Sequence, residues 1–189
     1  MAWVAEFPVT ATALYFLCFV FVSALCLPGA APLMLIGGAC FGLAWCTLLA
    51  NAASSVGALL TMLATRRWLK EKLPLRFSRP IARVQQLLSK ERLSILLGLR
   101  LAPAIPYPVL NIALAFTDVK AGLFFWTSFI GMLPGTFLYV NAGAQLGRIQ
   151  NTGDIFSAPV LVSLFALALL PYVLRKLLMY LGWTAPASP

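Results

Sequence analysis

The stretch that decides the fold reads Arg100-Leu-Ala-Pro103-Ala-Ile-Pro106-Tyr-Pro108-Val-Leu-Asn111-Ile-Ala-Leu-Ala-Phe116. Apolar sequence of this kind normally forms a membrane-spanning helix, but each proline removes an amide donor and clashes with a preceding carbonyl. Non-helical backbone at membrane depth is tolerated only where protein or a watery cavity covers it. The stretch therefore predicts a re-entrant hairpin with Arg100 at its mouth.

Composition places the whole chain in a membrane. Hydrophobic residues make up 61% of the 189 residues and charged residues only 10%, with a mean hydropathy of +0.92. Soluble domains are about 25% charged. The formal net charge of +9 would suit nucleic acid, but most of the Lys and Arg residues lie between Arg66 and Arg92. A basic segment between apolar blocks is typical of a cytoplasmic loop, so we expect membrane lipids as partners and no nucleic acid.

The hydropathy pattern divides the single membrane domain, residues 1–189, into consecutive segments. These are a first span (10–27), a first re-entrant hairpin with its span (28–65), a basic amphipathic cytoplasmic linker (66–95), a second re-entrant hairpin with its span (96–147), a last span (155–174) and a cytoplasmic tail (175–189). The linker is expected to lie on the membrane surface as a helix, with a plain solvated linker as the alternative. Pro28 and Pro32 are expected to break the first hairpin, and Pro134-Gly135 the span after the second.

The two halves of the chain resemble each other at a shift of 74 residues, which aligns Pro32 with Pro106, Ser54 with Ser128, and Gly57 with Gly131. With a cytoplasmic N-terminus, the first hairpin enters the membrane from outside and the second from the cytoplasm. The last span then ends inside, at Arg175-Lys176. The sequence thus predicts an all-α polytopic membrane protein, an inverted repeat with two opposed re-entrant hairpins and about four spanning helices.

The sequence offers no sign of catalysis, of a metal or of a cofactor. It contains no histidine, which excludes Ser-His and Cys-His nucleophile pairs. Cys18, Cys26, Cys40 and Cys46 lie inside apolar runs without CxxC spacing, which is typical of small buried thiols. We therefore expect a protein that is not an enzyme.

The pattern Arg100-x-x-Pro103-x-x-Pro106 followed by Asn111, with Gly131 and Pro134-Gly135 beyond it, resembles the VTT-domain (DedA, SNARE-associated Golgi protein) superfamily. The first hairpin of that family is similar to Gly37-Gly38-x-x-Phe41-Gly42, and the likeness runs from about Pro28 to Gly147. The resemblance implies opposed re-entrant hairpins and the movement of a polyprenyl phosphate or phospholipid across a plasma membrane, such as the bacterial inner membrane. The DedA branch carries acidic residues near the first hairpin, whereas Glu6 is the only acid here before Arg66, so proton coupling stays open.

For such a function, Arg100 and Asn111 are the candidate substrate contacts. Arg100 presents a planar fork suited to phosphate oxygens, although it could instead snorkel to the interface. Asn111 either contacts substrate or satisfies backbone groups freed in the opposite hairpin. The glycines that would let a lipid headgroup approach the backbone are Gly37, Gly38 and Gly42, and the prolines with Gly135 are expected to be architectural.

Two other classes of function remain open at this point. A small-solute or ion carrier would need an enclosed polar site, and the membrane segments hold few polar side chains. A non-transporting assembly or interaction protein would use the small-residue helix faces for docking. A homo-oligomer is compatible with either reading.

Overall fold

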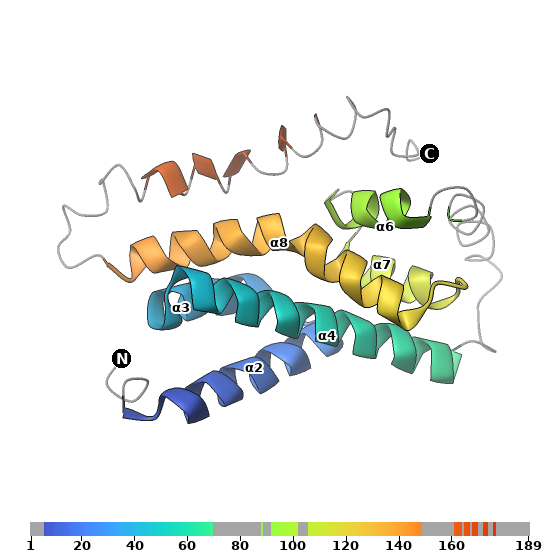
Figure 1. Cartoon of the computed structure of the whole chain (residues 1–189), viewed down its shortest axis with the longest axis horizontal. Coiled ribbons are helices and arrows are strands. Elements are labelled where there is room, and N and C mark those ends of the chain that lie inside the picture. The colour runs from blue at the N-terminus through green and yellow to red at the C-terminus, as the bar shows by residue number, and fades with distance from the viewer. Residues whose placement is uncertain are drawn as a thin grey trace. The chain divides into compact units, whose positions relative to one another are not determined.

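The computed structural model of the chain describes residues 6–69, 88, 92–101, 106–148 and, in the last apolar stretch, 161–163, 165–166, 168–169, 172–173 and 176. All regular structure in these residues is helical (Figure 1). The labelled helices are α2 (Pro8–Ala24), α3 (Ala30–Phe41), α4 (Leu43–Leu69), α6 (Arg92–Leu101), α7 (Tyr107–Ala115) and α8 (Ala121–Leu146). The predicted all-α class is confirmed for this part of the chain.

Two of these helices are long and apolar enough to cross a membrane, α4 over Leu43–Trp68 and α8 over its full length. About 20 apolar residues suffice for a crossing. The apolar helices α2 and α3 are shorter, with 17 and 12 residues. Most of the predicted linker helix, last span and tail lies outside the described residues, so the expected four spans stay a prediction.

Pro28 and Pro32 shape the start of α3 and do not break it. The turn after α2 contains Cys26 with a φ of 54°, in the left-handed region. Pro28 lies in this turn, and Pro32 is the third residue of α3. A helix has no intrahelical partner for its first amide donors, so the missing N–H does no harm there. The apolar stretch between the proline pair and Gly42 is therefore a helix.

Pro106 and Pro108 act in the same way at the start of α7. Pro106 has a non-helical ψ of 138° and α7 begins directly after it at Tyr107, so a helix begins where the prolines predict an interruption. Pro103 lies outside the described residues.

The predicted interruption at Pro134-Gly135 is wrong, because α8 runs through Pro134 as one helix. A single proline removes only one rung of the hydrogen-bond ladder, and an apolar helix can continue past it when its neighbours support the freed carbonyl.

The described helices contribute to two compact units. Unit 1 comprises residues 1–57 and 132–170, and unit 2 comprises residues 58–131 and 171–189. Unit 1 therefore holds α2 and α3 with the beginning of α4 and the end of α8. Unit 2 holds α6 and α7 with the end of α4 and the beginning of α8.

Unit 1 is held together by helices that approach one another at backbone distance. A Cβ added to Gly38 of α3 would meet the carbonyl oxygen of Val140 and lie 2.9 Å from the amide nitrogen of Ala144, both in α8. A Cβ added to Gly143 of α8 would likewise meet the backbone of Leu35 in α3, so each of the two helices has a glycine in this contact. Small residues allow such close approach, and dispersion forces then stabilise the pair of helices. The buried side chains around it are Phe19, Met34, Cys46, Ala50, Ala53 and Val140.

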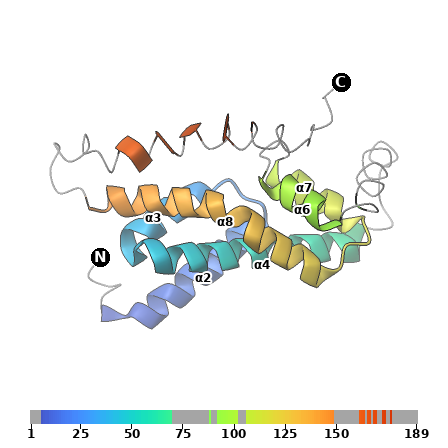
Figure 2. The same cartoon turned by 45° about the horizontal axis from the view of Figure 1, so that its top comes forward.

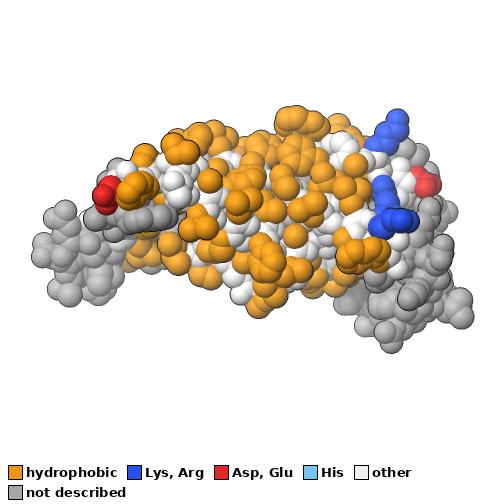
Figure 3. Space-filling view, turned by 90° about the horizontal axis from the view of Figure 1, so that it is seen from below, with side chains coloured by type: hydrophobic (Ala, Val, Ile, Leu, Met, Phe, Trp, Pro, Cys, Tyr) orange, Lys and Arg blue, Asp and Glu red, His pale blue; other side chains and the backbone are white. Residues whose placement is uncertain are grey.

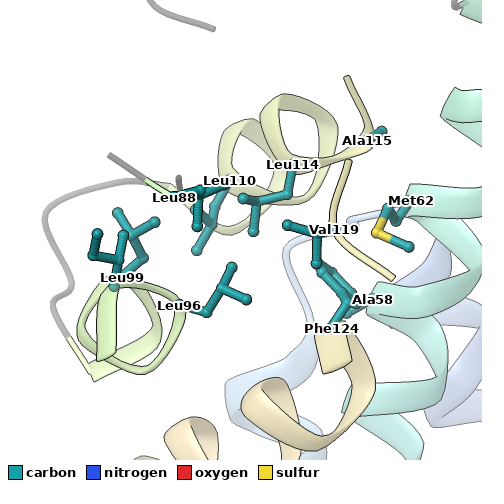
Figure 4. Packing of buried hydrophobic residues seen from close by; sticks show 11 residues of the cluster. Ala58, Met62, Leu88, Leu96, Leu99, Leu110, Leu114, Ala115, Val119 and Phe124 are labelled. Carbon is teal, nitrogen blue, oxygen red and sulfur yellow. The ribbon is translucent and has the colours of Figure 1, made fainter. Parts of the chain in front are cut away.

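Unit 2 has its own hydrophobic cluster, drawn in Figure 4. Helices α6 and α7 lie side by side (Figure 2) and contribute leucines to it. The end of α4 and the beginning of α8 complete it. The buried members are Ala58, Met62, Leu88, Ile95, Leu96, Leu99, Leu110, Leu114, Ala115, Val119 and Phe124.

Large hydrophobic side chains also cover the outside of the helices. Trp45 is 56% exposed, Trp126 60% and Ile36 58%. Hydrophobic side chains dominate the face drawn in Figure 3. Soluble monomers rarely expose contiguous apolar patches larger than a few hundred Å². This surface suits contact with lipid hydrocarbon.

The α3–α8 contact gives a first prediction. We expect Gly38→Ala to lower stability by about 1–3 kcal/mol, because backbone atoms of α8 occupy the space of the new methyl group. Gly122→Ala is the matched control, since a Cβ there meets nothing within 4 Å. Melting temperatures in lipid nanodiscs measure both. Equal melting temperatures for the two variants would contradict the close contact.

Candidate functional site

Arg100 lies in the last turn of α6, on the edge of the unit 2 core. A cation at this end of a helix is favoured by the helix dipole. Its Cζ atom lies 4.8 Å from the ring centroid of Phe124 and 5.8 Å from that of Tyr107. Cation–π contacts of this kind contribute about 0.5–2 kcal/mol. The two aromatic rings thus place the guanidinium in largely apolar surroundings.

Gly131 sets the distance between α8 and Arg100. A Cβ at this glycine would lie 2.6 Å from the Cβ of Arg100 and 3.6 Å from the carbonyl oxygen of Leu97. The absence of a side chain therefore lets α8 pack directly on the α6 turn that carries the arginine. Gly131 is a positioning residue for Arg100.

Asn111 lies in the middle of α7 and is fully buried, with 0% exposure. In the part of the chain that the structure describes, neither its Oδ1 nor its Nδ2 has a hydrogen-bond partner. Leaving a buried polar group unsatisfied costs about 1–3 kcal/mol. Tyr107 is four residues earlier and so on the same helix face, which places Asn111 on the side of α7 that Arg100 contacts. The structure thus groups Arg100 and Asn111 in one unit.

The three predicted glycines all belong to unit 1. Gly37 packs against the Tyr15 hydroxyl and the Cys46 Sγ atom, and Gly38 packs on α8, so both lie in helix contacts. The Tyr15 hydroxyl donates a hydrogen bond of 2.9 Å to the Leu33 carbonyl, which fixes the ring beside Gly37. Gly42 differs, because it is exposed, has a φ of 79° and would place a Cβ near nothing within 4 Å. Of the three, Gly42 alone presents open backbone.

Sequence reasoning missed Arg66, which it treated as one basic residue of the linker. Its Nε donates to the Ala115 carbonyl at 3.0 Å, and its Nη2 donates to the carbonyls of Thr117 and Val119 at 2.8 Å each. These carbonyls lie where α7 ends, and such groups have no intrahelical partner. Arg66 therefore ties the end of α4 to the end of α7.

A signal for Arg66 was present in the sequence. The small residues of α4 recur at every fourth position through Ala58, and the same spacing leads to Met62 and then to Arg66. Ala58 and Met62 are both fully buried. A basic residue that continues a buried stripe points toward protein, whereas its neighbour Arg67 is exposed.

The neighbouring arginines give a second prediction. Arg66→Met should lower stability by about 2–3 kcal/mol, because hydrogen bonds from a charged donor to three carbonyls are lost. Arg67→Met, a control with the same change of charge, should stay within about 0.5 kcal/mol. Thermal melting reports stability, and amide exchange should rise at residues 116–120 in the Arg66 variant only. Equal losses in both variants would show that charge alone matters.

None of the described residues forms a group of three or more His, Cys, Asp or Glu side chains that could hold a metal ion. The cysteines in that part are unpaired thiols, and Cys46 is the buried one.

Helices of membrane length and an apolar outer surface indicate a membrane protein that is helical throughout the part of the chain described by the structure. Residues 27–145 match the family model of the VTT domain. The chain belongs to the VTT-domain family, and the resemblance read from the sequence is confirmed.

Several curated relatives are transmembrane proteins by name. The Transmembrane protein 41 homolog of Caenorhabditis elegans is 31% identical over 164 residues, which cover 84% of this chain and 67% of the relative. The homolog of Dictyostelium discoideum is 32% identical over 84% of this chain and 49% of its own length. Transmembrane protein 41B of Mus musculus is 26% identical over 86% of this chain and 58% of its own length. The chain thus spans about half to two thirds of these relatives, and no solved structure matches it.

Proposed function

We propose that this protein moves a phosphate-bearing lipid, a polyprenyl phosphate or a phospholipid, across the bilayer. The observation that carries the proposal is the position of Arg100, a cation held against the rings of Phe124 and Tyr107 beside an apolar core. Charge at such a place is costly and is usually functional. A lipid phosphate is the anion that a membrane supplies in quantity.

The chemistry of Arg100 suits this substrate. A guanidinium offers parallel N–H donors that match two phosphate oxygens, and such charge-assisted bonds are among the strongest in proteins. A guanidinium can contact aromatic rings through its face and an oxyanion through its edge, so the rings beside Arg100 are compatible with phosphate binding. A headgroup that meets this cation exchanges part of its hydration for fixed donors, which lowers the barrier to crossing.

A separate groove in unit 1 suits the hydrocarbon part of a lipid. It has a volume of about 670 Å³ and is lined by Leu43, Ala44, Thr47, Leu48, Leu133, Pro134, Phe137 and Leu138. Thr47 is a polar residue in this lining, and its hydroxyl already donates a hydrogen bond of 2.6 Å to the Leu43 carbonyl. An apolar groove on membrane-length helices favours a lipid over a small polar solute.

The proposal includes a topology and a location. We place the protein in a plasma membrane such as the bacterial inner membrane, N-in and C-in, with α3 and α7 as the helices of two opposed re-entrant hairpins. The placement of two glycines supports the repeat. Gly57 packs on α2 at Ser23 and Ala24, whereas Gly131, 74 residues later, packs on α6 at Leu97 and Arg100.

Two further parts of the proposal concern what the protein does not do. We propose that it is not an enzyme and that it binds no nucleic acid. A small-solute carrier would show transport of solutes without lipid movement, and an assembly protein would show neither. Lipid translocation by the purified protein in liposomes separates all three classes.

Arg100 gives the test of the mechanism. Arg100→Ala should reduce lipid translocation at least tenfold because the phosphate contact is lost, while stability should fall by no more than the aromatic contacts contribute, about 0.5–2 kcal/mol, because the core is kept. Arg100→Lys keeps the charge without the fork, so it should retain partial activity. Flip rate in proteoliposomes and melting temperature are measured on the same preparations.

Arg148→Ala is the control, since Arg148 is an exposed arginine after α8. It should leave both readings unchanged. A stable Arg100→Ala protein with the wild-type flip rate would remove Arg100 from the site. An equal fall in stability and activity would make its role structural.

The topology is tested by single cysteines in a background without native cysteines. Gln85→Cys lies in the basic linker and Asn151→Cys follows α8. We expect a membrane-impermeant maleimide to label residue 151 from outside intact cells and residue 85 only after the cells are opened. The reverse labelling pattern would contradict the N-in, C-in topology.

A further inference from the structure

We infer that Asn111 selects lipids whose headgroup carries a hydrogen-bond donor next to the phosphate. This inference rests on the proposed function and names its substrate class more closely. It starts from the amide of Asn111, which is fully buried and has neither Oδ1 nor Nδ2 bonded to any described residue.

The two unsatisfied atoms demand different partners. Nδ2 carries two donors and is satisfied by a phosphate oxygen, whereas Oδ1 is an acceptor and needs an N–H or O–H group. A fully ionised phosphate offers acceptors only and would leave Oδ1 unsatisfied. A headgroup that joins a phosphate to an ammonium or hydroxyl group satisfies both atoms at once.

The position of Asn111 fits such a headgroup. Tyr107, whose ring contacts the Arg100 guanidinium, and Asn111 are four residues apart in α7, a rise of about 6 Å along one face. Arg100 of α6 therefore lies on the same side of α7 as Asn111. A phosphate on Arg100 would leave the adjoining headgroup atoms within reach of the amide.

Because Asn111 is buried, we expect it to select between headgroups while the lipid crosses the protein, and not when the lipid first binds at the surface. The amide must meet the headgroup after that group has left bulk water, where a missing hydrogen bond is no longer replaced by solvent. Sites of this kind reject a ligand that lacks the required donor far more strongly than one that differs only in bulk.

The experiment uses a methylation series of acyl-labelled phosphatidylethanolamine in proteoliposomes of the full chain. Ethanolamine and its mono- and dimethyl derivatives keep at least one N–H donor, and the trimethyl derivative, phosphatidylcholine, has none. We expect similar flip rates for the first three and a rate about tenfold lower for the last, which corresponds to ~1.4 kcal/mol. A gradual decline over the series would indicate exclusion by size and would overturn the inference.

Asn111→Leu tests the residue itself. It replaces an unsatisfied amide by an apolar group of similar shape, so folding should be retained. The step, which is the fall in flip rate between the dimethyl and the trimethyl lipid, should disappear. Asn111→Ala should lose the step as well and serves if the leucine variant does not fold. A step that persists in either folded variant overturns the inference.

Asn141→Leu is the matched control. Asn141 is a partly buried asparagine of unit 1, where Nδ2 donates to the Ser163 Oγ atom at 2.9 Å. Its loss should leave the step intact. If the wild-type protein moves all four lipids at the same rate, this inference fails and the proposed function stands. If it moves none of them, nor a polyprenyl phosphate, the proposed function fails and the inference with it.

Discussion

Backbone groups left unpaired in an apolar environment are costly, and the three hydrogen bonds of Arg66 satisfy them where α7 ends. A short helix of nine residues has at least as many orphan carbonyls and amides as internal hydrogen bonds. In water these groups would be solvated, but beside a hydrophobic cluster they need a partner from the protein. The charged donor at the end of α4 therefore stabilises the short helix that carries Asn111.

Glycine provides the second condition for this architecture. Short helices bury little side-chain area, so they must be held by close backbone contact. Gly38 and Gly143 give this contact between α3 and α8, and Gly131 gives it between α8 and the Arg100 turn of α6. The same residue type therefore stabilises one unit and positions the candidate site in the other. A glycine that packs against another helix is not open to a lipid headgroup. In α3, Gly37 and Gly38 pack against protein.

Much of this could be predicted from sequence, because hydropathy and proline position are local signals. They predicted the all-helical class, the apolar stretches of α4 and α8 and the start of a new helix after Pro106, while the motif around Arg100 indicated the family. Pro134 was misjudged, since whether a proline ends an apolar helix depends on its neighbours. The role of Arg66 could not be separated from that of Arg67 by charge alone. Gly37 and Gly38 look alike as open backbone until the tertiary contacts with Tyr15 and α8 are known.

The division into units shows how the two halves of the sequence depend on each other. The boundary falls after Gly57 in α4 and after Gly131 in α8, at equivalent places in the 74-residue shift, and not in the basic linker. Each unit thus joins the short helices of one half to the end of the long helix from the other half. Unit 2 takes Ala58 and Met62 from the first half, and unit 1 takes Val140 from the second. Neither half of the sequence contains a complete core, so the surroundings of Arg100 need the end of α4 from the first half as well as the short helices of the second.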